Sequence, residues 1–225
     1  MNQPVKNPMT IAVVALGKIG LPLAVQFARK GHHVIGCDVN ATTVDLVNKG
    51  IEPFPGEAHL AEYLADVVKS GHLTATTDTT AAVAKAQAVV VVVPLFVDKD
   101  GVPDFGWMDD ATAKIASGLT KGTLVSYETT LPVGTTRNRF APALEKGSGL
   151  VAGKDFSLVF SPEREDPGNP DFSASVIPKL VGGTDEASGK LAYALYSRVV
   201  SKAHFVSSAE VAERSEEHTS ELQSH

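Results

Sequence analysis

The chain has 225 residues, of which 43% are hydrophobic and 20% are charged, and its formal net charge is -6. This composition is that of an ordinary globular protein with one large domain or one and a half, and the acidic balance disfavours a nucleic-acid-binding surface. The longest aliphatic run, residues 88–93, is too short to span a membrane. Because the first ten residues also lack the apolar core of a signal peptide, the expected location is the cytoplasm.

Segment 10–24 joins an apolar, β-branched run to a turn of small residues, and an amphipathic stretch follows as far as Gly31. This order predicts a strand, a tight turn and a helix, as in a dinucleotide-binding site. The turn reads A-x-G-x-x-G, because Ala15 stands at the position of the first glycine. Gly17 and Gly20 would let a pyrophosphate approach the backbone, where the first N–H groups of the helix bind it. Close packing alone is the competing explanation for such small residues.

A second apolar run, 33–37, ends on Asp38, eighteen positions after Gly20. A carboxylate there accepts hydrogen bonds from the ribose of NAD and repels the 2′-phosphate of NADP, so the expected cofactor is NAD. The run also contains Cys37, the single cysteine, so no internal disulfide can form. An apolar strand and a neighbouring carboxylate both disfavour a thiolate. Cys37 is therefore expected to be a core residue.

The rest of the chain alternates predicted helices and strands. Helices are expected at 41–49 with Asn40 as N-cap, at 57–70, 78–86 and 107–119, from the turn 128–136 to about 146, at 184–200 with Thr184 as N-cap, and from 208; strands are expected at 73–76, 87–93, 122–127, 156–160, 177–183 and 204–206, and a polar loop at 94–106. This alternation predicts a Rossmann-like, doubly wound α/β fold, with a mostly parallel sheet and helices on both faces. Such sheets bind ligands beyond the carboxyl ends of their strands.

The expected organisation has four parts. Residues 1–9 form a loose lead, residues 10–207 an NAD-binding domain, and residues 208–213 the start of an interdomain helix. Residues 214–225 have almost no apolar content and resemble the translation of a sequencing-library adapter, so they are expected to be a non-native tail. The seven histidines show no metal-ligand spacing, and no metal site is predicted.

Three segments carry a family resemblance: GKIGLPLA at 17–24, ETTLPVGTT at 128–136 and SPER at 161–164. Together they resemble the nucleotide-sugar dehydrogenases, and segment 161–169 is most similar to the UDP-N-acetylglucosamine and UDP-N-acetylmannosamine branch. That family oxidises the C6 alcohol of the sugar to a carboxylate in two steps and reduces two NAD. The resemblance implies a UDP-sugar substrate, a full-length homodimer or higher homo-oligomer, and a place in bacterial polysaccharide biosynthesis.

The resemblance also implies roles at the cofactor. The backbone N–H groups of Lys18 and Ile19, between Gly17 and Gly20, would bind the pyrophosphate, with Asp38 on the ribose. Leu95 stands where the family often has a threonine beside the cofactor, so the sequence departs from the family pattern there.

Four further residues receive roles by the same resemblance. Glu163 would manage water and protons in the later steps, as a carboxylate can when burial and a cation tune its pKa. Thr130 would lie near the nicotinamide and the catalytic water. Arg164 and Glu165 would contact the sugar nucleotide.

The family's nucleophile is a cysteine in a later domain, whose thiolate holds the sugar aldehyde, assisted by a lysine and an asparagine. Cys37 cannot take this role, because it belongs to the cofactor strand. The chain is therefore expected to be an amino-terminal part that is inactive alone. Two alternatives stay open: a β-hydroxyacid dehydrogenase of the 6-phosphogluconate type, which segment 161–169 disfavours, and a non-catalytic NAD-binding module.

Overall fold

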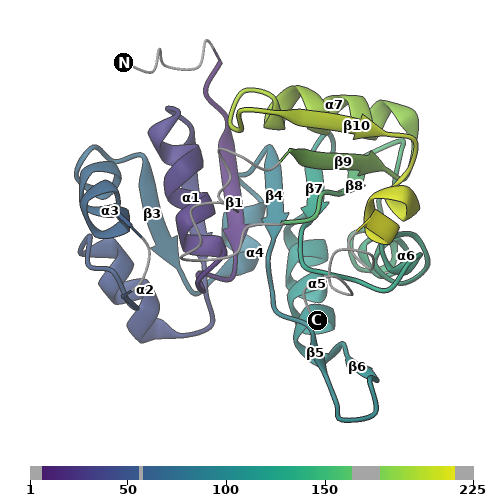
Figure 1. The fold of residues 1–225 in the computed structure, drawn as a ribbon, viewed down its shortest axis with the longest axis horizontal. Helices are drawn as coiled ribbons and strands as arrows, with labels where there is room; N and C mark the ends of the chain where they lie inside the picture. Colours follow the sequence, from purple (N-terminus) through teal and green to yellow (C-terminus); the bar gives the residue numbers. More distant parts are fainter. Residues whose placement is uncertain (1–6, 56–57, 164–177, 216–225) are drawn as a thin grey trace.

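A computed structural model of the chain describes residues 7–55, 58–163 and 178–215. Its centre is an eight-stranded sheet in the order β10-β9-β8-β7-β4-β1-β2-β3 (Figure 1). The strands are β1 (Thr10–Val14), β2 (His33–Cys37), β3 (Leu73–Thr76), β4 (Ala88–Val91), β7 (Leu124–Tyr127), β8 (Ser157–Phe160), β9 (Lys179–Gly183) and β10 (Ala203–Val206). The helices are α1 (Gly20–Arg29), α2 (Ala41–Asn48), α3 (Leu60–Lys69), α4 (Thr79–Val83), α5 (Gly106–Gly118), α6 (Ala141–Ser148), preceded by the π-helical segment η1 (Thr136–Phe140), and α7 (Glu186–Tyr196), with a further helix at 209–215.

The sheet is mostly parallel, as predicted. From β3 to β8 all neighbouring strands run in the same direction. β9 then pairs antiparallel with β8, and β10 follows β9 in parallel. Because β9 runs backwards, its first residue, Lys179, lies at the edge of the sheet where β7 and β8 end. This reversal places a residue from late in the chain at the carboxyl edge of the parallel strands.

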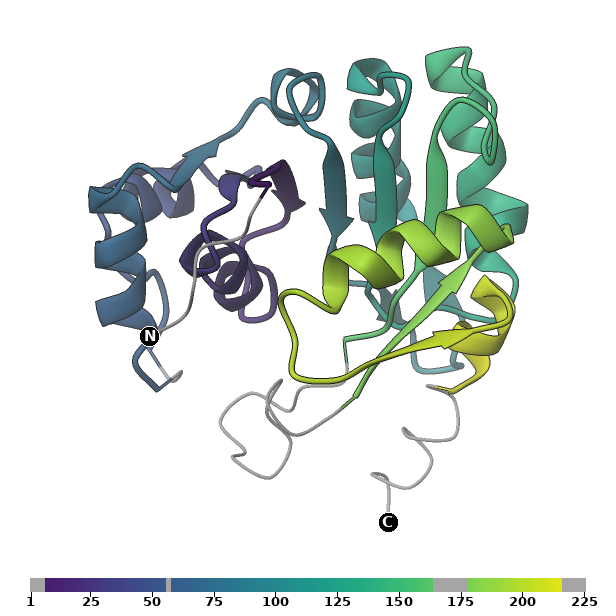
Figure 2. The same cartoon turned by 90° about the horizontal axis from the view of Figure 1, so that it is seen from above.

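Helices cover both faces of the sheet, as a doubly wound fold requires. Ile11 and Val13 of β1 belong to a buried cluster with α1, α3 and α7, whereas Ala12 and Val14 belong to a second cluster with α4, α5 and α6. This alternation follows from the two-residue period of a strand. In Figure 2, α7 crosses the face of the sheet at the β9 end. None of the helices in the described residues combines the length and apolar character needed to cross a membrane.

The predicted N-cap of the helix after β9 is wrong. Asp185, and not Thr184, caps α7, because its carboxylate accepts a hydrogen bond from the backbone N–H of Ser188 at 2.9 Å. The hydroxyl of Thr184 donates instead to the carbonyl of Leu158 in β8. The predicted cap of α2 is confirmed, since the side chain of Asn40 accepts from two backbone N–H groups in the first turn. Several other element ends lie a few residues from their predicted positions.

The loop predicted at 94–106 contains a β-hairpin. It pairs β5 (Phe96–Val97) with β6 (Pro103–Asp104) and projects from the rest of the molecule (Figure 1). The side chain of Asp98 closes its turn by accepting hydrogen bonds from the backbone N–H groups of Asp100 and Val102, each at 2.9 Å. Two-residue strands are too short to show an alternation of apolar and polar residues. The polar turn residues therefore led to the prediction of a loop.

Candidate functional site

The turn between β1 and α1 is tightly held. Ala15 has a φ of 77°, in the left-handed region that favours glycine. Its backbone N–H donates to the carbonyl of Cys37 at 2.8 Å, and the N–H of Leu16 donates to the carboxylate of Asp38 at 2.8 Å. The alanine at the first glycine position therefore adopts the glycine conformation. Contacts from the end of β2 hold it there.

The two remaining glycines of the turn have different environments. A Cβ on Gly20 would lie 1.9 Å from the carbonyl oxygen of Ala15, so this glycine is required for α1 to pack against the turn. A Cβ on Gly17 would meet nothing within 4 Å, and Gly17 has no left-handed φ that requires a glycine. The fold itself therefore does not require glycine at position 17. The absent side chain leaves the backbone open to a ligand.

The N-terminus of α1 fits an anionic ligand. Its cap position, Ile19, offers no side-chain hydrogen bond to the helix, and the first turn contains no acidic residue. Uncapped N–H groups and the helix dipole favour an anion at such an end. Lys18 is exposed beside Gly17. The predicted pyrophosphate site at 17–20 coincides with this uncapped helix start.

Asp38 lies directly beyond β2 and is half-buried. One of its carboxylate oxygens accepts from the N–H of Leu16, and the other accepts from the N–H of Asn40 at 2.8 Å. Each carboxylate oxygen has two lone pairs, so both oxygens keep capacity for ribose hydroxyls. Asp38 thus joins the end of β2 to the β1–α1 turn before any ligand binds.

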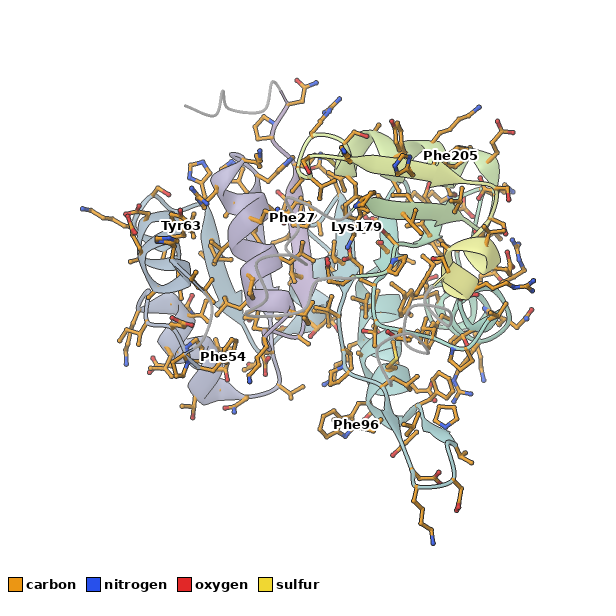
Figure 3. The ribbon with its side chains drawn as sticks, viewed as in Figure 1. Phe27, Phe54, Tyr63, Phe96, Lys179 and Phe205 are labelled. Carbon is orange, nitrogen blue, oxygen red and sulfur yellow. The ribbon has the colours of Figure 1, made fainter. Side chains whose placement is uncertain are left out.

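A second group of polar side chains lies at the same edge, beyond β7 and β8. The ammonium of Lys179 donates to the carboxylates of Glu128 at 2.5 Å and Glu163 at 2.7 Å. The hydroxyl of Tyr196 contacts Glu128, and it lies 2.9 Å from the hydroxyl of Ser126. Figure 3 labels Lys179 near the middle of the molecule. We call these five residues the Lys179 cluster.

Burial dominates the electrostatics of the Lys179 cluster. It raises the pKa of the Glu128 carboxyl; Lys179 opposes this effect and the charge of Glu163 adds to it. Burial alone would lower the pKa of Lys179, but the two carboxylates outweigh it and hold that pKa above its ordinary value. Burial and the charge of Glu128 raise the pKa of Tyr196. Lys179 is therefore cationic and Tyr196 neutral at pH 7.

Two more sequence-predicted residues lie on this edge. Thr130 is exposed just beyond β7, and Leu95 is half-buried beyond β4. The neighbouring hydroxyl of Thr129 donates to the carbonyl of Val93 at 2.7 Å, which ties the two strand ends together. Arg164 and Glu165 lie outside the described residues.

Cys37 is a core residue, as predicted. It is fully buried at the end of β2, and burial raises the pKa of its thiol to about 12. A thiol in this state is a poor nucleophile. The described residues contain no group of three or more His, Cys, Asp and Glu side chains that could hold a metal ion.

Sequence reasoning did not assign roles to Lys179, Glu128 and Tyr196. Glu128 had a signal, because an acidic residue directly after a buried strand is unusual unless it has a partner. Lys179 and Tyr196 gave no comparable signal in the sequence. They reach the site only because β9 runs antiparallel to β8 and because α7 packs on the sheet.

Comparisons with known proteins show the family of this chain. Residues 9–200 match the model of the UDP-glucose/GDP-mannose dehydrogenase family, NAD binding domain. Protein CapL of Staphylococcus aureus is 35% identical over 90% of this chain and 46% of its own length, and UDP-N-acetyl-D-glucosamine 6-dehydrogenase of Pseudomonas aeruginosa is 34% identical over 91% and 47%. The structure of UDP-D-ManNAc dehydrogenase from Pyrococcus horikoshii has a TM-score of 0.85 at 32% identity, over 91% of this chain and 48% of that one.

The chain thus spans about half the length of the curated relatives it matches. Residues 9–200, which match the NAD binding domain, contain the glycine turn, Asp38 and the parallel strands that carry them. The cofactor of this domain is NAD, as predicted. This chain belongs to the UDP-glucose/GDP-mannose dehydrogenase family and contains its NAD binding domain.

Proposed function

We propose that this chain is the NAD-binding part of an enzyme that oxidises the C6 alcohol of a UDP-N-acetylhexosamine to a uronic acid with two NAD. The observation that carries the proposal is one of placement. The open turn at Gly17, the carboxylate of Asp38 and the carboxylate of Glu163 all lie at the carboxyl edge of one sheet. Relatives over the same residues are named as dehydrogenases of UDP-N-acetylglucosamine and UDP-N-acetylmannosamine. A place in polysaccharide biosynthesis follows from the same substrates.

The residues divide between cofactor and substrate. The N–H groups near Gly17, Lys18, Ile19 and Gly20 bind the pyrophosphate, and Asp38 binds the adenosine ribose. When bound, NAD supplies the hydride acceptor. Leu95 lines the cofactor where the family often has a hydroxyl.

The proposed proton chemistry belongs to Glu163, with Thr130 beside the nicotinamide and the reacting water. A carboxylate held by Lys179 at the sheet edge can accept a proton from water or from the sugar alcohol. Arg164 and Glu165 are proposed to bind the sugar nucleotide. A cytoplasmic location and a homo-oligomeric full-length enzyme remain predictions, as do the domain limits at 9, 207 and 213.

The covalent step requires a thiolate that the proposal places outside this chain. Cys37 is the only cysteine, and its burial and its pKa of about 12 exclude it as the nucleophile. We therefore expect no NADH from UDP-N-acetylglucosamine, UDP-N-acetylmannosamine or UDP-glucose when the chain is assayed alone, since losing a covalent nucleophile reduces rates by several orders of magnitude. Turnover that survives Cys37→Ser and is abolished by Glu163→Gln would contradict this part of the proposal.

The source DNA beyond codon 213 separates the enzyme from a non-catalytic NAD-binding module. The proposal expects an open frame that encodes a glycine-rich segment with a cysteine. A stop codon directly after codon 213 would favour the module.

A further inference from the structure

The charged side chains of the Lys179 cluster differ in their exposure to solvent. The side chains of Glu128 and Lys179 are 0% and 5% exposed, whereas that of Glu163 is 12% exposed. Glu163 is therefore the most exposed of the three charged side chains. The other charged members lie behind it in the interior.

The inner members of the cluster are fixed. The backbone N–H of Glu128 donates to the carbonyl of Val91 at 3.0 Å, and its side chain is held by Lys179 and Tyr196. The ring of Tyr196 lies 5.5 Å from the ammonium of Lys179, which adds a cation–π contact. Lys179 therefore has a rigid anionic and aromatic support on its inner side.

Two hydrogen bonds join Glu163 to these inner residues. Its backbone N–H donates to the carbonyl of Glu128 at 3.0 Å, and its carboxylate accepts from Lys179 at 2.7 Å. A buried ion pair contributes little net stability compared with apolar residues of similar volume. Stability alone is thus a weak explanation for a charged cluster at the edge of this sheet.

We propose that Lys179 is a positioning residue, which holds the Glu163 carboxylate at the carboxyl edge of the sheet. This inference rests on the proposed role of Glu163 as the proton-accepting group. Glu128 is the inner partner of Lys179, and Tyr196 contacts Glu128. These contacts bring Glu128, Glu163 and Tyr196 to Lys179 as its titratable neighbours.

The test follows the Glu163 carboxyl directly by ¹³C NMR, in the chain labelled at its glutamate carboxyls, with the resonance assigned by its loss in Glu163→Gln. In Lys179→Met, the midpoint of its titration should move to higher pH by about one unit or more, because an opposite charge at this distance favours the ionised form. Lys179→Arg should restore most of that shift. Lys202→Met removes an exposed lysine from the segment beside β9 and should leave the midpoint unchanged.

Glu128→Gln should shift the titration midpoint of Glu163 in the opposite direction. It removes a like charge and leaves Lys179 in place, so the Glu163 midpoint should move to lower pH. This variant decides the question if Lys179→Met does not fold. Midpoints that stay unchanged in Glu128→Gln, or in a folded Lys179→Met, would overturn the inference.

The titration needs neither NAD nor a sugar nucleotide. Failure of the positioning role is therefore seen in the NMR midpoints. Failure of the proposed function is seen separately, in NAD binding and in NADH formation.

Discussion

Ala15 is the residue at which this nucleotide turn differs from the glycine pattern. Its φ of 77° places an L side chain in a region that costs roughly 1–2 kcal/mol. Hydrogen bonds from Ala15 and Leu16 to the end of β2 offset this strain. The conformation of this turn therefore depends on contacts with β2 and Asp38 more than it would if position 15 were a glycine.

Replacement of Ala15 by glycine should relieve the strain. We expect Ala15→Gly to raise the free energy of unfolding by about 0.5–1 kcal/mol, because glycine adopts this φ without a steric penalty and only part of the gain is lost to chain entropy. Ala113→Gly, at an exposed position inside α5, should lower it by about 1 kcal/mol. Urea denaturation measures both, and equal destabilisation by the two changes would contradict the strain argument.

At the scale of elements, the start of α1 contains one glycine that the fold requires, Gly20, and one that it does not, Gly17. Gly17→Val should leave the free energy of unfolding within about 0.5 kcal/mol of the wild-type value, because its side chain would enter open space. The same change should weaken NAD binding about tenfold or more, which is about 1.4 kcal/mol. Gly20→Ala should instead destabilise the chain by roughly 1–3 kcal/mol, because its Cβ collides with backbone.

Thermal unfolding and NAD titration of the two variants test this difference. If Gly17→Val binds NAD with wild-type affinity, then NAD does not occupy the open space beside Gly17. Gly20→Ala with unchanged stability would show that the turn can shift away from α1.

The elements show what a sequence can predict here. The β1–α1–β2 unit was predictable because its periodicity, small residues and terminal Asp38 all lie within thirty positions of one another. The Lys179 cluster was not, because its members span residues 126–196 and meet only through the reversal of β9 and the packing of α7. The N-cap of α7 was misplaced by one residue because Thr184 and Asp185 are both good caps, and only the contact with β8 decides between them.

At the scale of the whole molecule, stability should depend on pH through a buried histidine. His32 is fully buried beside Phe27 of α1, and one of its ring nitrogens accepts from the N–H of Met9 at 3.2 Å. Burial, with the nearby charge of Arg198, lowers the pKa of His32 below its ordinary value of 6.5. The folded state therefore favours neutral imidazole, and it loses stability as the pH falls below about 6.5.

The measurement is the free energy of unfolding of the wild type and of His32→Gln between about pH 7.5 and 5.5. The advantage of the wild type over the variant should shrink as the pH falls, because unfolding then takes up a proton at His32. An advantage of His32 that is constant or grows toward pH 5.5 would contradict this account.

The proposed function makes one central prediction for the whole arrangement of sheet, turn and acidic residue, which is that the chain binds NAD through the 15–20 turn and Asp38. Calorimetric titration of the wild type, Asp38→Asn and the exposed control Asp66→Asn with NAD and NADP tests it most directly. Asp38→Asn keeps the shape of the side chain, and it should lose about 1.5–3 kcal/mol of NAD binding, because ribose hydrogen bonds to a charged group are lost. We expect the wild type to prefer NAD to NADP and Asp66→Asn to bind as the wild type does; equal NAD affinity in the wild type and Asp38→Asn, or tighter binding of NADP by the wild type, would contradict the account.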